Sequence, residues 1–79
     1  MVHELKTISP YYEEIEKGNK RFEIRLNDRD YKVGDILALR HWSDFRGCFT
    51  REQRIYVKVT YILDDERFLQ PGYVCMSIE

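Results

Sequence analysis

Residues 18–25, which read Gly18-Asn19-Lys20-Arg21-Phe22-Glu23-Ile24-Arg25, decide most of what this chain reveals about its fold. Apolar and charged residues alternate here and at the next position, the two sets being Phe22, Ile24 and Leu26 against Arg21, Glu23 and Arg25. A β-strand therefore places the apolar side chains on one face and the charged ones on the other. Long charged side chains are costly to enclose unless they are paired or liganded. The stretch predicts a short strand after a glycine turn, with its charged face held in a cleft.

The candidate site within this stretch consists of Lys20, Glu23 and Arg25. Lysine and arginine can bind phosphate or a polar base edge, and a glutamate can accept a hydrogen bond from a base amino group. The plainer alternative is a structural ion-pair network, in which Glu23 bonds Lys20 or Arg25 and only holds the strand to its neighbours. His3 is a minor further candidate, because a lone histidine is more often a structural hydrogen-bond donor.

Further short elements are expected on both sides of this stretch. Ser9 is a good N-cap for a helix of about two turns, with Pro10 at its first position and Gly18 ending it. Strands are expected over residues 2–6, 20–26, 36–42, 54–63 and 73–78, and residues 43–53 are expected to form a loop with some hairpin character. With five or six strands and one helix, the predicted fold class is α+β and mostly β, a small and mainly antiparallel barrel.

The expected strand over residues 54–63 has the clearest alternation in the chain. One face is expected to carry Ile55, Val57, Val59, Tyr61 and Leu63, and the other Tyr56, Lys58, Thr60 and Ile62. Eleven aromatic residues provide much area per residue, so we expect a thin core rich in aromatic rings.

Size and composition bound the organisation of the protein. With 79 residues, of which 43% are hydrophobic, the chain can build only one compact domain, residues 1–79. We expect a cytoplasmic protein without a membrane partner, because no segment resembles a signal peptide and no apolar run approaches the roughly 20 residues that span a bilayer. Cys48 and Cys75 lack the spacing of a redox or zinc site and are expected to be reduced, and no cofactor or metal is predicted.

Charge is distributed unevenly, although the net charge is only −1. Residues 18–58 hold ten basic and six acidic residues, whereas both flanking segments are acidic overall. In the basic segment, Arg29 and Arg40 are suited to phosphate because a guanidinium donates two parallel hydrogen bonds, and Trp42 offers a ring on which a base can stack. The alternative is a solvated charged surface, with Trp42 in the core.

The spacing of Gly18, Lys20, Glu23 and Arg25 resembles the signature Gly-x-Lys-x-x-Glu-x-Arg of the ASCH domains, a branch of the PUA-like β-barrels that are thought to bind RNA or nucleotides. Other segments recur in order in one small ASCH-like family of unknown function, so that the resemblance covers nearly the whole chain: His3-Glu4-Leu5-Lys6, Asn27-Asp28-Arg29, Val33-Gly34-Asp35 and Pro71-Gly72-Tyr73-Val74. The chain departs from that family at Phe49-Thr50-Arg51-Glu52, where a Thr-Gly-Arg turn is expected.

This resemblance implies a PUA-like pseudo-barrel with an RNA- or nucleotide-binding cleft, formed by Lys20, Glu23, Arg25, Arg29, Arg40 and Trp42. It also implies an alternative function, because the ASCH-like barrels include a bacterial amidohydrolase that deacetylates N4-acetylcytidine with a lysine at the position of Lys20. A threonine follows that lysine by three residues, where this chain has Glu23. Catalysis here would need Glu23 as a general base for water, with Lys20 or Arg25 stabilising the oxyanion. A third possibility is a protein-interaction module, in which the acidic loop Asp64-Asp65-Glu66 meets a basic partner.

Overall fold

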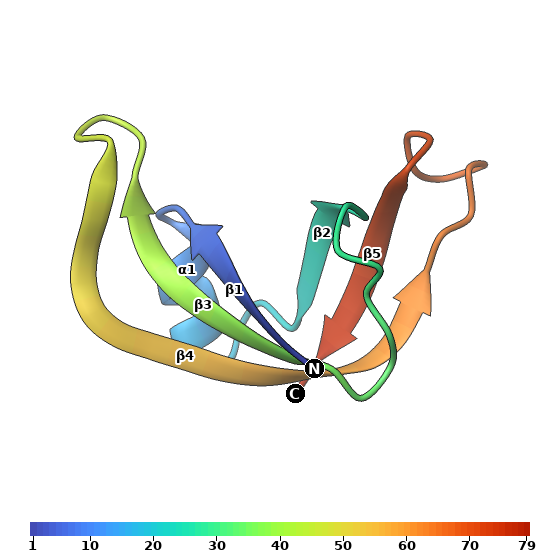
Figure 1. The fold of residues 1–79 in the computed structure, drawn as a ribbon, viewed down its shortest axis with the longest axis horizontal. Coiled ribbons are helices and arrows are strands. Elements are labelled where there is room, and N and C mark those ends of the chain that lie inside the picture. Colours follow the sequence, from blue (N-terminus) through green and yellow to red (C-terminus); the bar gives the residue numbers. More distant parts are fainter.

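The computed structural model describes all 79 residues as five strands and one short helix (Figure 1). In chain order these elements are β1 (Val2–Thr7), α1 (Tyr11–Glu16), β2 (Phe22–Leu26), β3 (Ile36–Ser43), β4 (Cys48–Leu63) and β5 (Tyr73–Ile78). The predicted small, mostly β class with one N-terminal helix is confirmed. The helix has six residues, far fewer than a membrane-spanning helix requires.

The five strands form a single open sheet in the order β1-β3-β4-β5-β2. β1 runs parallel to β3, and all the other neighbours are antiparallel. Figure 1 shows two arms that meet at the bend of β4, one formed by β1, β3 and the first part of β4, the other by β2, β5 and its last part. Because β1 and β2 are the unpaired edges, the expected barrel is not closed by strand pairing, and side chains fill the space between the two arms.

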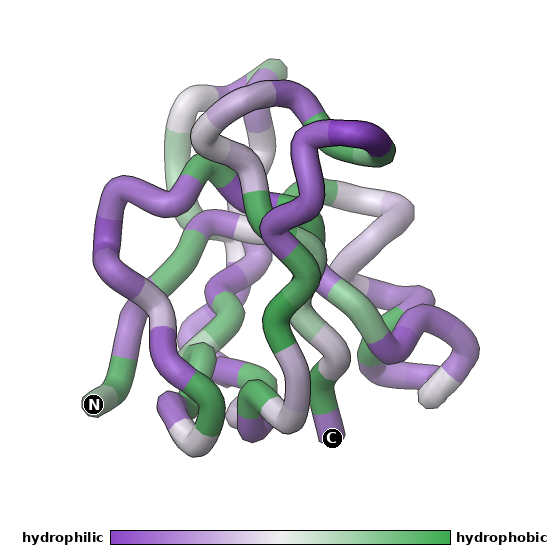
Figure 2. Tube along the Cα trace, turned by 90° about the vertical axis from the view of Figure 1, so that its right-hand side faces the viewer, coloured by the Kyte–Doolittle hydropathy of each residue, from purple (hydrophilic) through white to green (hydrophobic).

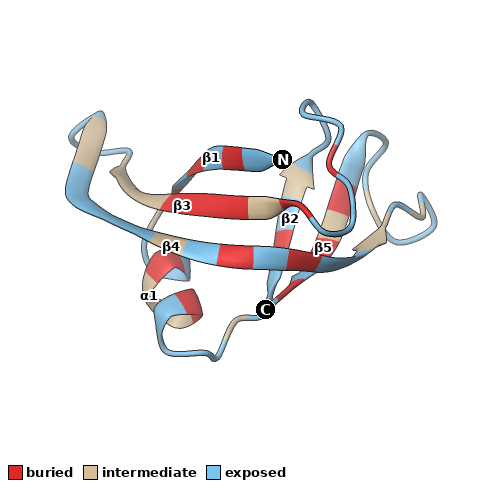
Figure 3. Cartoon of the chain, turned by 60° about the horizontal axis from the view of Figure 1, so that its bottom comes forward, coloured by how far each residue is buried: buried red, intermediate tan, exposed pale blue.

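The expected loop over residues 43–53 is wrong for most of its length, because β4 already begins at Cys48. A tight turn joins β3 to β4, and in it the Gly47 N–H donates to the Ser43 carbonyl at 2.8 Å. Gly47 has a φ of +65°, which glycine adopts without a side-chain clash. Residues 50–54 of β4 are exposed on both faces, so neither face needs apolar side chains and this stretch lacks the strand period (Figure 3).

The predicted faces of β4 hold only as far as Val59. Val57 and Val59 are buried as expected, but the pairing with β5 shifts between Val59 and Tyr61. This irregularity turns Tyr61 outward, and Ile62 packs against the core instead. A β-bulge of this kind changes the phase of a strand by one residue, which a strict two-residue period cannot anticipate.

The core is mainly aliphatic, and the expectation of an aromatic core is wrong. The buried cluster contains a single aromatic ring, Tyr31, among aliphatic residues and a methionine from four strands and the helix: Leu5, Ile15, Leu37, Leu39, Val57, Val59, Val74, Met76 and Ile78. Figure 2 shows how hydrophobic and hydrophilic residues alternate along the strands that enclose it. Since aliphatic side chains fill the space between the arms, most of the aromatic rings are left at the surface.

Helix α1 lies beneath the arm that contains β3 (Figure 3). Its Tyr12 and Ile15, three positions apart, point into the protein, and this leaves Tyr11 on the outside. The expected cap at Ser9 is wrong: the N-cap position is Pro10, and no side chain caps the helix. The Ser9 hydroxyl donates to the Glu13 carboxylate at 2.8 Å instead.

Candidate ligand-binding cleft

Strand β2 is turned so that its charged face points into the protein. Glu23 is only 3% exposed, whereas Phe22, Ile24 and Leu26 on the opposite face are about half exposed. The register with β5 pairs Glu23 with the fully buried Met76, so the carboxylate enters on the same face as the core. The alternation expected from the sequence is therefore present, and the charged side is the inner one.

Three side chains form a compact ion-pair cluster on this inner face, which we call the Glu23 triad: Lys20, Glu23 and Arg25. The Lys20 ammonium donates to Glu23 Oε1 at 2.6 Å, and also to the Phe22 carbonyl at 2.6 Å. Arg25 places both Nε and Nη2 at 2.8 Å from Glu23 Oε2. Each carboxylate oxygen thus has a cationic partner, and the triad carries one surplus positive charge.

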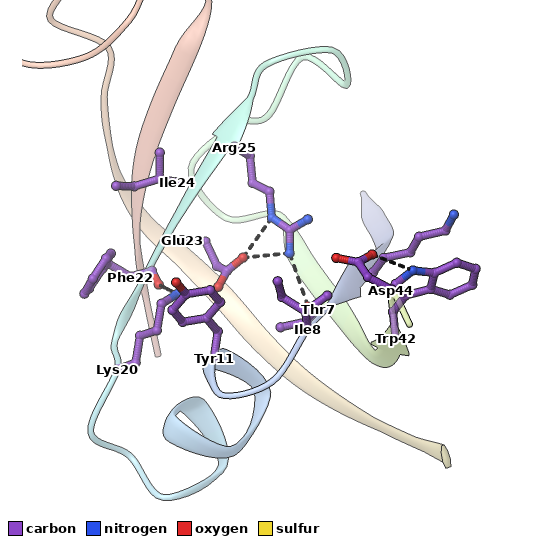
Figure 4. A pocket seen from close by; sticks show the side chains of 11 residues that line it. Thr7, Ile8, Tyr11, Lys20, Phe22, Glu23, Ile24, Arg25, Trp42 and Asp44 are labelled. Carbon is purple, nitrogen blue, oxygen red and sulfur yellow. Dashed lines mark hydrogen bonds and ion pairs between the residues drawn. The ribbon is translucent and has the colours of Figure 1, made fainter. Parts of the chain in front are cut away.

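The triad is connected to strand β1 across the open edge of the sheet. Arg25 Nη2 donates to the buried hydroxyl of Thr7 at 3.2 Å, which joins the unpaired edges of β2 and β1 (Figure 4). The guanidinium is thereby fixed in orientation from two sides. Its remaining terminal nitrogen, Nη1, and one ammonium hydrogen of Lys20 have no protein partner, so both are free to bind a ligand.

A cleft of about 630 Å³ opens above the triad, between the edges of β1 and β2. Tyr11, Phe22 and Trp42 contribute rings to its lining. Lys20 Nζ lies 4.7 Å from the centre of the Phe22 ring, and Lys6 Nζ lies 3.9 Å from that of Trp42. Aromatic rings and cations are therefore mixed at the rim, which is a common composition in sites that hold planar, anionic ligands.

The sequence-predicted residues divide between two places. Lys20, Glu23, Arg25 and Trp42 all line the cleft. Arg29 lies in an adjoining cavity of about 400 Å³, which Arg25 also lines. Arg40 lines neither cavity; it pairs with Glu4 at 3.2 Å, and its guanidinium lies 3.6 Å from the centre of the Phe49 ring.

Sequence reasoning missed several residues that line the cleft, chiefly Lys6, Thr7 and Tyr11. The signal for Tyr11 was present, because the three-residue spacing of Tyr12 and Ile15 assigns them to the buried side of the helix and leaves Tyr11 outside. No local signal identified Thr7, since its role depends on the approach of β1 to β2, which are far apart in the order of the sheet.

His3 is structural. Its Nε2 lies 2.8 Å from the Asp35 carboxylate, and both side chains are buried away from the cleft. The Lys32 backbone N–H also donates to this carboxylate at 3.0 Å. These hydrogen bonds, that of His3 foremost, lower the pKa of Asp35 from its usual 3.8 to about 2. The pair holds the start of β1 against the turn that precedes β3.

Comparison with known proteins shows relatives without an assigned function. The chain is 33% identical over 69 residues to a protein of Escherichia phage P2 described as "Uncharacterized 12.9 kDa protein in GpA 3'region". The alignment covers 87% of this chain and 61% of the phage protein, so the chain spans less than two thirds of that relative's length. Residues 2–78 match a family described as "Domain of unknown function (DUF3850)". The chain therefore belongs to the DUF3850 family.

Proposed function

We propose that this chain is an ASCH-type, PUA-like domain that binds RNA or a nucleotide through the cleft around the Glu23 triad. The observation that supports the proposal most strongly is the free donor capacity above a buried carboxylate. Glu23 holds Lys20 and Arg25 in place, and each cation keeps at least one hydrogen-bond donor that no protein group uses. A ligand phosphate or base carbonyl supplies the missing acceptors.

The aromatic lining supports a nucleotide over a simple anion. Tyr11 and Phe22 are each about half exposed and flank the Lys20 ammonium, 5.6 Å and 4.7 Å from their ring centres. A base stacks on such a ring, while its phosphate meets the cation beside it. One face of Trp42 is already covered by Lys6, so the tyrosine and phenylalanine are the more accessible stacking platforms.

Binding can be tested by calorimetric titration of the protein with the four ribonucleoside monophosphates and with mixed-sequence RNA hexamers, at about 50 and about 200 mM salt. Arg25→Ala should weaken binding by about tenfold, because it removes one charge-assisted contact. Arg67→Ala is the matched control, since Arg67 pairs with Asp65 on an exposed loop outside the cleft. Equal affinity of Arg25→Ala and the parent would reject this cleft. Should Arg25→Ala not fold, Arg25→Lys and Lys20→Met provide the same comparison.

The hydrolase alternative rests on the 2.6 Å contact between Lys20 and Glu23. In such a reaction water adds to the acetyl carbonyl of N4-acetylcytidine, Glu23 accepts the proton of the water, and the N4 leaving group is protonated to give cytidine and acetate. Both oxygens of Glu23 already accept from cations, so an attacking water would have to compete with Lys20 or Arg25 for the carboxylate. A chromatographic time course with Glu23→Gln and Lys20→Met as controls decides this alternative: turnover by the parent alone would establish it.

A further inference from the structure

The cleft continues into the adjoining cavity of about 400 Å³. Lys6 and Arg25 line both spaces, so the two cavities are successive parts of one groove along the facing edges of β1 and β2. Its second part is lined by Arg29, Tyr31 and Phe49. The groove therefore extends well beyond the volume that surrounds the Glu23 triad.

Three arginines converge beside this second part, at Glu4. Arg29 Nη1 donates to the Glu4 carbonyl at 2.8 Å. Arg40 and Arg54 hold the two carboxylate oxygens at 3.2 and 3.1 Å. The Glu4 carboxylate thus pairs with two guanidinium groups, while the Arg29 guanidinium is held by a neutral backbone carbonyl and its charge is left uncompensated. That positive charge makes this end of the groove attractive to an anion.

Arg29 is the member of this group that is best placed to bind a ligand. It uses only Nη1, on a backbone carbonyl, so its Nε and Nη2 are free. It also lines the cavity itself, unlike Arg40 and Arg54, which are occupied with Glu4. A phosphate in the second part of the groove can therefore receive two parallel hydrogen bonds from one guanidinium.

We propose that the groove holds single-stranded nucleic acid of at least two nucleotides, with one phosphate between Lys20 and Arg25 and the next beside Arg29. This inference rests on the proposed function and specifies its ligand class. Rings border both parts of the groove, Tyr11 and Phe22 in the first and Phe49 in the second, where Arg40 covers one face of the Phe49 ring and the other face is the one left for a base. Unpaired bases can stack on these rings, whereas the bases of a duplex are already stacked on one another.

An acidic peptide fits the groove less well than a nucleic acid. Asp44 lines the first part and Asp28 the second, so each cavity presents a carboxylate as well as cations. The exocyclic amino groups of bases donate hydrogen bonds to carboxylates, whereas the carboxylates of a peptide are repelled by them. The mixed lining therefore favours a ligand that alternates anionic groups with hydrogen-bond donors.

The test is a length series of single-stranded oligocytidylates and oligoadenylates, from the monophosphate to the hexamer, titrated against the protein by calorimetry. The dissociation constant should fall by about tenfold or more between the monophosphate and the trinucleotide, and then level off. Arg29→Met should reduce the ratio of trinucleotide to mononucleotide affinity towards one. Arg67→Met, which changes an arginine outside the groove, should keep the parent's ratio. Arg29→Lys provides a second variant if the methionine substitution does not fold.

Each outcome of this series has a separate meaning. If monophosphates bind and longer oligonucleotides bind no more tightly, the extended groove is overturned and the proposed function stands. Absence of binding to every nucleotide would overturn both. A duplex or polyglutamate that binds as tightly as the single-stranded hexamer would show that the groove selects for charge only, and would also reject the inference.

Discussion

Strands β2 and β5 lie side by side in the sheet but use their inner faces in opposite ways. β5 directs Val74, Met76 and Ile78 into the core, in the usual arrangement of a half-buried strand. β2 directs Glu23 and Arg25 inward and leaves Phe22, Ile24 and Leu26 on the opposite, half-exposed face, although the first two also line part of the cleft. Two neighbouring strands with the same alternating pattern can therefore place opposite kinds of side chain on the inner face of the sheet, apolar ones from β5 and charged ones from β2.

The physical reason for this difference is the position of each strand in the sheet. β5 is central, between β4 and β2, so its inner face is covered by the core. β2 is an edge, and its inner face borders the cleft, where Glu23 is paired with Lys20 and Arg25 and the two cations remain partly exposed to water. An edge next to a cleft thus tolerates ionised side chains that a central strand would exclude.

The largest expected loss of stability is at Met76 of β5, which is paired with Glu23 of β2. Met76→Ala removes a side chain with no solvent exposure and should lower the free energy of unfolding by about 3 kcal/mol. Urea denaturation of parent and variant, followed by tryptophan fluorescence, measures this loss. A loss below about 1 kcal/mol would mean that the core between the arms is loosely packed.

A smaller loss of stability is expected at Glu23, the residue of β2 that is paired with Met76. Glu23→Gln leaves Lys20 and Arg25 without their anion and should cost about 2 kcal/mol, because both cations are mostly buried. Glu14→Gln is the matched control; Glu14 forms an exposed pair with Lys17 at 3.6 Å and should change stability by less than about 0.5 kcal/mol. Equal effects of the two substitutions would show that the triad does not stabilise the fold.

Asp35 is a third residue whose side chain is buried, and its contribution to the stability of the fold depends on pH. Its pKa is lowered to about 2, so the folded state favours the ionised form. That contribution is complete above the usual pKa of 3.8 and is lost as the pH falls from about 4 to about 2. Asp35→Asn should therefore be less stable at neutral pH and show a flatter acid limb in urea titrations. If the parent and Asp35→Asn lose stability equally as the pH falls, the assignment is contradicted.

The smallest effect is expected on the outer face of β2. Ile24 is half exposed, and Ile24→Gln should change the free energy of unfolding by less than about 0.5 kcal/mol. An assignment of the faces from hydrophobicity alone predicts a far larger loss, because it would bury this isoleucine. Thermal unfolding of the parent and Ile24→Gln shows whether Ile24 is half exposed or buried. A loss of stability comparable with that of Met76→Ala would mean that the outer face of β2 is covered.

Local patterns predicted much of the fold. The strands over residues 36–42 and 73–78 and the grouping of Lys20, Glu23 and Arg25 follow from alternation and from the glycine turn. The bulge beyond Val59 and the strand character of residues 48–53 did not, because both depend on pairing between strands rather than on local composition. Arg29 and Arg40 could not be placed for the same reason, since their partner, Glu4, lies on a strand distant in sequence.

If the inward charge of β2 binds a ligand, and does not only hold the strand in place, then RNA should perturb the groups around the Glu23 triad. We would test it most directly by recording ¹H–¹⁵N spectra of the parent protein during titration with mixed-sequence RNA hexamers. We expect salt-sensitive shifts of the Arg25 Nε–H, the Trp42 indole N–H and the backbone amides of residues 20–25. Unchanged signals at these positions, or shifts confined to the acidic loop at residues 64–66, would contradict it.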